Sequence, residues 1–343
     1  MQKKKIKLYL VFVFVLFIFV LYFSLKDNYK DILNALSKVK IIYLIIGILF
    51  VFISKCLIGI IVYLIAKKEH KDVSLKKMIN IEIIYPFFAG ITPGSSGGES
   101  FEILYMKQTG IPYGKATSVT IQKYILYQIS LIIVNAIALI LNIFTDIIPK
   151  SGLVNFAVTI NFLFNISLLT ILFLLAYNKK FNHFIMKRGL SFLCKIKVIK
   201  DLEKTQNKLD SYLDNFDDGV DKLKEDKKLF IKLILISMSS LIFLIGAAIP
   251  VARSLNINSI SILNLFVLAA YVKMISLLIV TPGNSGAAEY SFIYLFTGLL
   301  LEDDIMAYML VWRFVTYYIP LITGGVLAMT WRKENKDEET NCA

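Results

Sequence analysis

The chain of 343 residues is 57% hydrophobic and has a mean hydropathy of +0.67, which excludes an ordinary soluble globular protein. The formal net charge is +13, but the basic residues lie between apolar runs, where membrane topology explains them, so we expect no nucleic-acid partner. The three cysteines and two histidines show no metal-ligand spacing, and we expect neither a metal nor another cofactor.

Six apolar segments are long enough to cross a bilayer, which predicts an all-α fold, a polytopic integral membrane helical bundle. The first segment follows a basic cluster and has no small-residue cleavage site after it, which favours a retained span over a signal peptide. The predicted spans are 6–25, 41–66, 115–144, 155–177, 229–253 and 305–331.

Two further apolar blocks run directly into a pair of similar polar stretches, "TPGSSGGE" at 92–99 and "TPGNSGAAE" at 281–289. Proline has no N–H and its ring obstructs a helix, while glycine reaches backbone angles that other residues avoid, so each stretch predicts a broken helix. Inside a bilayer such a backbone is tolerated only where protein or a water-filled cavity supplies hydrogen-bond partners. The blocks are 78–91 and 261–280, and the short helices expected after the two stretches are 99–110 and 289–300.

The distribution of Lys and Arg sets the expected orientation. If the N-terminus is cytoplasmic and each broken block enters and leaves on one side, the cytoplasmic segments carry 28 Lys and Arg, 14 of them within 178–232. The outside segments then carry six. Cytoplasmic loops of membrane proteins are enriched in these residues, so the count favours re-entrant hairpins and places both termini in the cytoplasm.

The likeness between two halves of the chain extends past the polar stretches. Glu99 precedes Lys123 by 24 residues, and Glu289 precedes Arg313 by the same number. In the predicted topology the halves run in opposite directions, which predicts an inverted repeat with two broken elements, an arrangement typical of secondary transporters. The alternative is a pair of helix-breaking turns at the membrane surfaces, left by an old duplication. The halves are 41–144 and 229–331.

The helices after the two breaks are expected to start near Gly98 and Ala287, where free N–H groups and the positive end of the helix dipole favour an anion. A phospholipid phosphate is the natural anion inside a membrane. The serine and asparagine side chains beside each break are suited to satisfy its backbone or to cap the next helix. The predicted substrate-binding residues are Ser95, Ser96, Gly97, Gly98, Glu99, Lys123, Lys273, Asn284, Ser285, Gly286, Glu289 and Arg313.

Glu99 and Glu289 lie in the first turn of these helices, where two roles fit. They cap the helix dipole, or they bind a cationic headgroup or a coupling proton. Their expected partners are Lys123 and Arg313, and Arg313 suits phosphate because its planar guanidinium donates two parallel hydrogen bonds. Lys273, deep in its apolar block, is expected to face a cavity rather than the membrane interface.

The longest polar segment, 178–228, has one apolar helical face, so we expect a cytosolic amphipathic helix that lies on the bilayer or on the bundle. A partner-binding helix is the alternative. The residues 1–335 are expected to form a single transmembrane domain, and the tail 336–343 is expected to be disordered. The apolar face consists of Leu202, Leu209, Leu213, Phe216, Val220 and Leu223.

Three stretches of the chain resemble the transmembrane, flippase-like region of lysylphosphatidylglycerol synthases. They are "TPGSSGGESFEILYMKQTGIPYGKATSVTIQKY", "TPGNSGAAEYSFIYLFTGL" and "WRFVTYYIPLITGG", and the resemblance extends over about 5–335. At Lys123 the family usually has arginine, so the chain departs from the pattern there. The residues that match the pattern are Pro93, Gly98, Glu99, Pro282, Gly286, Glu289 and Arg313.

The resemblance implies a lipid flippase that moves a phospholipid, such as lysylphosphatidylglycerol or another modified lipid, between leaflets. The alternative is the membrane part of a phosphatidylglycerol lysyltransferase or glycosyltransferase system that works with a separate soluble domain. A structural or regulatory membrane subunit is a third hypothesis. The longest segment outside the spans is too short for a soluble catalytic core, so we do not expect this chain alone to transfer an aminoacyl group.

We expect a multi-pass protein of a bacterial plasma membrane, with a membrane phospholipid as its partner. The sequence leaves open whether the chain takes part in catalysis, whether it has a soluble transferase partner, and whether it forms a homo-oligomer.

Overall fold

The computed structural model describes residues 37, 39–92, 96–195, 202–278 and 284–329, and these residues fold into helices without a named strand. The all-α prediction is therefore confirmed for the described part of the chain. The predicted span 6–25, the tail 336–343, both termini and Ser95 lie outside it.

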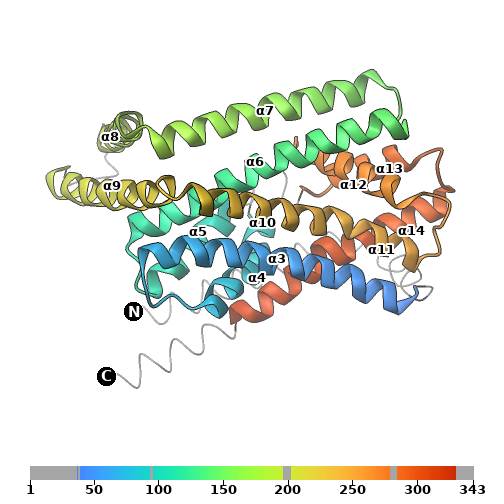
Figure 1. The fold of residues 1–343 in the computed structure, drawn as a ribbon, viewed down its shortest axis with the longest axis horizontal. Coiled ribbons are helices and arrows are strands. Elements are labelled where there is room, and N and C mark those ends of the chain that lie inside the picture. The colour runs from blue at the N-terminus through green and yellow to red at the C-terminus, as the bar shows by residue number, and fades with distance from the viewer. Residues whose placement is uncertain (1–36, 38, 93–95, 196–201, 279–283, 330–343) are drawn as a thin grey trace.

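Five helices have the length and apolar composition needed to cross a membrane, and they confirm the predicted spans within the described residues. Most run along the long axis of the bundle (Figure 1). They are α3 (Ile41–Glu69), α6 (Tyr113–Thr145), α7 (Gly152–Tyr177), α10 (Lys227–Gly246) continued by α11 (Ala248–Ser254), and α14 (Glu302–Arg313) continued through η3 (Phe314–Tyr318) to Met329.

Four shorter helices form two helical hairpins at the predicted places. The first hairpin is α4 (Leu75–Gly90) against α5 (Ser96–Gln108), and the second is α12 (Ile262–Ser276) against α13 (Ala287–Phe296). The longest of these helices has 16 residues, or about 24 Å, which is short of the ~30 Å hydrocarbon core. Figure 1 shows the two hairpins in opposite halves of the bundle, whereas their relation as an inverted repeat stays a prediction.

Local hydrogen bonds show why each hairpin turns where it does. In the first, Thr92 Oγ1 donates to the carbonyl of Phe88 (2.8 Å) and accepts from the N–H of Gly97 (2.9 Å), so one hydroxyl joins the end of α4 to the start of α5. In the second, Gly286 has φ of 85°, a value that favours glycine, and its N–H donates to Glu289 Oε2 (2.7 Å). This bond caps α13, which begins at the predicted residue.

Buried apolar side chains gather in two main clusters, and each hairpin packs into one of them. One cluster joins α11, α12, α13 and α14 to α3, α6 and α10. The other joins α4 and α5 to α3, α6 and α10. The helices α3, α6 and α10 therefore connect the two halves, and a hydrogen bond between Ser54 of α3 and Ser240 of α10 (2.8 Å) lies between the clusters.

The polar segment forms α8 (Lys179–Lys195) and α9 (Leu202–Lys224), and α9 packs along the start of α6. Four residues of its predicted apolar face are buried, Leu213, Phe216, Val220 and Leu223, while Leu209 is half-buried and Leu202 lies outside the described side chains. Of the alternatives open from the sequence, packing on the bundle is confirmed for α9.

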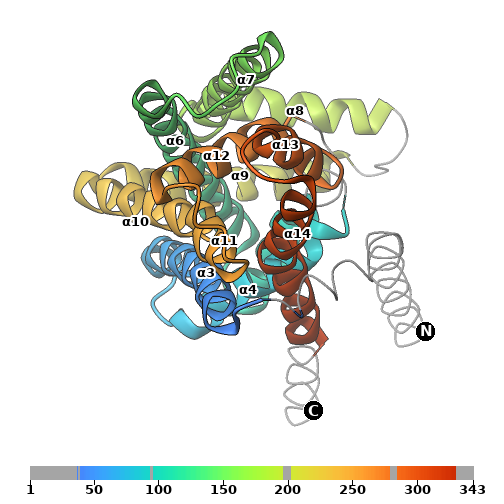
Figure 2. The same cartoon turned by 90° about the vertical axis from the view of Figure 1, so that its right-hand side faces the viewer.

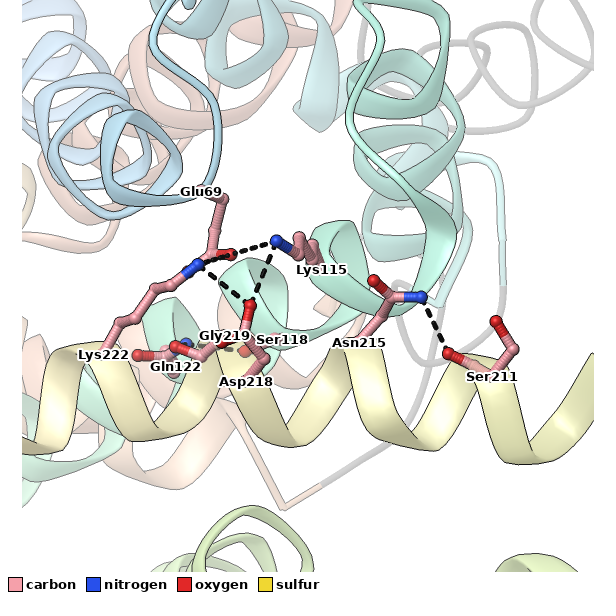
Figure 3. A network of polar contacts seen from close by, with 9 residues as sticks. All are labelled: Glu69, Lys115, Ser118, Gln122, Ser211, Asn215, Asp218, Gly219 and Lys222. Carbon is pink, nitrogen blue, oxygen red and sulfur yellow. Dashed lines mark hydrogen bonds and ion pairs between the residues drawn. The ribbon is translucent and has the colours of Figure 1, made fainter.

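A network of ion pairs holds α9 against the ends of α3 and α6 (Figure 3). The buried Glu69 carboxylate lies 3.4 Å from Lys115 Nζ and 3.2 Å from Lys222 Nζ, and Asp218 bridges the same two lysines at 3.1 Å and 2.9 Å. Hydrogen bonds from Lys222 and then Lys115 hold the pKa of Asp218 below its usual value. The four charges balance, so no unpaired charge is buried with Glu69.

The crossing of α6 and α9 depends on glycine, which gives a testable expectation for Gly114→Ala. A Cβ at Gly114 would lie 2.3 Å from the carbonyl oxygen of Tyr212, which is backbone and cannot rotate away. We expect a loss of about 1–3 kcal/mol of stability, typical of overpacking. The check is thermal unfolding in detergent together with protease cleavage of α9. Gly152→Ala is the control because its Cβ meets nothing within 4 Å, and equal behaviour of the two variants would contradict the expectation.

Candidate functional site

Lys123 of α6 is the centre of an ion-pair triad in the first half. Its Nζ lies 2.6 Å from Glu102 Oε2 on α5 and 2.8 Å from Glu82 Oε1 on α4, and all three residues are buried. The predicted pair between Lys123 and Glu99 is therefore wrong. The cation 24 residues after Glu99 pairs instead with the carboxylate one turn further along α5 and with a second one from α4.

Glu99 is held by a different group. Tyr85 of α4 donates its hydroxyl to Glu99 Oε1 (2.6 Å), and no described residue donates a hydrogen bond to the buried Oε2. Two ammonium groups also lie near the Tyr85 ring. Lys55 Nζ is 5.7 Å and Lys123 Nζ is 4.8 Å from its centroid, distances that allow a cation–π contact. Tyr85 therefore links Glu99 to Lys55 and Lys123.

In the second half, Arg313 pairs with Glu289, as predicted. Arg313 Nε lies 2.8 Å from Glu289 Oε1, and its Nη2 donates to Ser285 Oγ (3.2 Å). Since Glu289 Oε2 accepts the N–H of Gly286, this carboxylate both caps α13 and binds the cation. The guanidinium also lies 4.6 Å from the centroid of the Tyr317 ring. The hairpin turn and the long helix after it are thus joined through one carboxylate.

A cavity of about 410 Å³ lies between the two hairpins. The first hairpin contributes Glu82, Tyr85 and Glu99 to its wall, and the second contributes Lys273 and Asn284. The remaining walls come from α3, α6, α7 and α10. The volume is in the range of small-molecule sites, about 300–1,000 Å³.

A second cavity of about 150 Å³ continues from the first toward Arg313. Lys273, Asn284 and Leu244 line both cavities. The ion pair of the second half therefore borders a space that meets the larger cavity at Lys273.

The charges around the larger cavity are compensated unequally. Lys123 has two carboxylates in contact, whereas Lys55, Lys273 and the Glu99 carboxylate have no ion-pair partner among the described residues, which leaves more unpaired cations than anions on the wall. Lys273 Nζ lies 5.9 Å from the centroid of the Tyr127 ring. A lysine inside a membrane bundle is costly unless it meets an anion or water, so these two ammonium groups favour an anionic occupant.

The wall of the cavity reaches the outer surface of the bundle at α7. Phe164 lines the cavity and is also 54% exposed, and its neighbour on the wall is the buried Asn165. In a membrane the exposed part of α7 contacts hydrocarbon. The cavity therefore offers a polar interior beside an apolar side.

With this geometry in place, the comparisons with known proteins decide the family. The model of the lysylphosphatidylglycerol synthase transmembrane region matches residues 8–324. The chain belongs to this family. A UPF0104 membrane protein of Archaeoglobus fulgidus is 25% identical over 261 residues, which cover 74% of the chain and 76% of that relative. Membership of the lysylphosphatidylglycerol synthase transmembrane family makes the chain a multi-pass membrane region of lipid metabolism or translocation.

The predicted binding residues of this family member divide between the two hairpins and the cavity. Glu99, Lys123, Lys273 and Asn284 line the larger cavity. Ser285, Gly286, Glu289 and Arg313 form the contacts at the second turn. Gly97 and Gly98 lie in the first turn of α5, where Gly98 packs against the Tyr85 ring, and Ser96 begins that helix.

Most residues of the cavity wall are not among the predicted ones, and Lys55, Glu82 and Tyr85 are those that contact the charged groups of the site. Glu82 is the one acidic residue of an otherwise apolar block, and an ionisable residue in such a position is by itself a signal of function. Lys55 carries the same signal in α3. Tyr85 has no such signal, because tyrosine is common in membrane helices and only the fold brings it to Glu99.

Proposed function

We propose that the protein moves an anionic phospholipid between the leaflets of its membrane, with the headgroup in the cavity between the hairpins. The observation that supports the proposal is the pair of lysines, Lys55 and Lys273, that line this cavity without a carboxylate partner among the described residues. A phosphate oxygen accepts charge-assisted hydrogen bonds from ammonium groups, which offsets the cost of keeping the lysines inside the bundle.

The shape of the site supports the same proposal. A glycerophosphate headgroup fits a volume of about 410 Å³, whereas two acyl chains need a far larger apolar space. The exposed side of Phe164 offers a place where the chains stay in lipid while the headgroup enters. We propose further that the two hairpins are inverted copies, so that each gives access from one leaflet.

The test is lipid movement in vesicles that contain only the purified protein. Fluorescent phosphatidylglycerol is reconstituted, and dithionite bleaches the probe in the outer leaflet, so movement appears as bleaching beyond the outer-leaflet share. We expect Lys273→Gln and Lys55→Gln each to slow movement about 10- to 100-fold, because a hydrogen bond to a charged group contributes about 1.5–3 kcal/mol.

The control variant is Lys150→Gln, since Lys150 is 81% exposed and lines neither cavity. All variants are first checked for folding in detergent and are then reconstituted into vesicles in equal amounts. Movement at the normal rate in both cavity variants would contradict the proposal.

A second candidate function rests on the name of the family, which refers to a synthase. In this case the membrane region binds a lipid for a separate soluble transferase and does not move it alone. The same vesicles distinguish the two functions. Binding of phosphatidylglycerol that depends on Lys273, without any movement by the unaltered protein, would favour the second.

A further inference from the structure

The helix α8 is strongly basic. Its sequence "KKFNHFIMKRGLSFLCK" contains five Lys and Arg and no Asp or Glu. The following helix, α9, carries many carboxylates, so the positive charge of α8 is not a general property of the segment. Such a helix with Phe and Ile among its cations has the composition of helices that lie in a membrane interface.

The orientation of α8 agrees with a position in the membrane interface. Figure 1 shows α8 almost end-on beside the end of α7, while α7 runs along the bundle. After the 90° turn, Figure 2 shows α8 lying across the view. The helix therefore lies across, and not along, the helices that span the membrane. Asn178 is the single residue between α7 and α8, so α8 starts at the level where the span ends.

The two faces of α8 have different surroundings. One face contacts α9, where Lys179 Nζ lies 2.7 Å from Asp221 and His183 Nε2 lies 3.3 Å from Asp217. The opposite face is exposed, with Phe184 56% and Ile185 43% accessible.

Two cations flank the exposed apolar pair. Lys180 and Arg188 lie one turn before and one turn after Phe184, both are exposed, and neither has an ion-pair partner among the described residues. The guanidinium of Arg188 lies 5.5 Å from the centroid of the Phe184 ring. The result is an apolar centre with a cation on each side. We call this patch, made of Lys180, Phe184, Ile185 and Arg188, the α8 patch.

We propose that the α8 patch binds the surface of an acidic phospholipid leaflet, with Phe184 and Ile185 in the acyl boundary and Lys180 and Arg188 on lipid phosphates. The occupant is a lipid surface because the preceding turn of α7 exposes Phe173 and Leu174 at the end of a membrane span. The α8 patch continues this apolar surface at the level of the headgroups. Cations near an anionic leaflet gain attraction, and buried apolar side chains add to it.

The test places a spin label on the full chain in vesicles. Cys56, Cys194 and Cys342 are replaced by serine, and a nitroxide is attached at Phe184→Cys or, in a second variant, at Ile185→Cys. The accessibility of the label to oxygen and to a water-soluble nickel chelate reports its depth. Vesicles consist of phosphatidylcholine alone or of phosphatidylcholine mixed with phosphatidylglycerol. A label at Asp214→Cys, exposed on α9, serves as the aqueous control.

We expect oxygen accessibility to exceed nickel accessibility at 184 and 185 in the mixed vesicles, with the reverse at 214. Lys180→Gln combined with Arg188→Gln should move the labels toward water in the mixed vesicles, and Lys180→Arg should leave them in place. Nickel accessibility at 184 and 185 equal to that at 214 in both vesicle types would overturn the proposal. So would labels that become protected only when a soluble protein is added, since this result would identify a protein as the occupant.

Discussion

Lys123→Met is expected to destabilise the protein by about 3–5 kcal/mol, because it leaves Glu82 and Glu102 buried without their shared cation. Both carboxylates are almost inaccessible, at 2% and 0%, so they would stay buried without a counter-charge. We expect a large fall in the thermal midpoint in detergent and loss of the monodisperse species on size exclusion.

The triple variant Lys123→Met with Glu82→Gln and Glu102→Gln separates charge from packing. If the loss comes from uncompensated carboxylates, removing both negative charges restores most of the stability. Lys150→Met is the matched control, since it removes an exposed lysine from an ion pair with Asp146 and is expected to change stability by less than about 1 kcal/mol. If Lys123→Met alone were as stable as this control, the structural role of the triad would be contradicted.

Arg313→Gln is expected to affect both stability and lipid movement. The substitution removes the cation beside Glu289, the hydrogen bond to Ser285 and the guanidinium near the Tyr317 ring. We expect the free energy of unfolding to fall by about 2–3 kcal/mol. The 26% exposure of the Glu289 side chain keeps the loss below that of a fully buried pair. Arg313→Lys is expected to keep the positive charge but lose the geometry of the contacts. The guanidinium reaches Glu289 through Nε and Ser285 through Nη2, and a single ammonium nitrogen cannot occupy both places. The lipid movement of this variant should fall at least tenfold with a smaller change in thermal midpoint.

A double-mutant cycle with Glu289→Gln isolates the pair. We expect a coupling free energy of about 1.5–3 kcal/mol between positions 313 and 289, measured by chemical unfolding in detergent. The combined variant should regain stability without regaining lipid movement. A coupling near zero would show that the ion pair does not hold the second turn, and restored movement would remove Arg313 from the proposed function.

The helices and the two hairpins could be predicted from the sequence because they depend on local signals. Apolar runs of sufficient length mark α3, α6 and α7, and the repeated Thr-Pro-Gly stretches mark the breaks after α4 and α12. The start of α13 at Ala287 could be predicted for the same reason, because Gly286 directly precedes it in the second stretch. In the structure this glycine has a positive φ.

The partners inside the site were harder to predict. Glu99 and Glu102 are three residues apart on one helix, and sequence spacing does not say which of them reaches Lys123. Tyr85 holds Glu99 away from Lys123 by donating a hydrogen bond to it. Glu82, which lies 41 residues before Lys123, is the second carboxylate that pairs with this lysine. The pair in the second half was predictable because no competing carboxylate lies within one turn of Glu289 on α13.

The glycine crossing of α6 and α9 has a mechanical consequence. At Gly114 and Gly219 the two helices approach so closely that a side chain has no room, and the charges of Lys115 and Asp218 lock the same crossing. Helices in such contact slide past one another only with difficulty, so a rotation of α6 must carry α9 with it. Because α6 also bears Lys123 on the cavity wall, we expect a movement of α6 that changes this wall to be accompanied by a movement of α9.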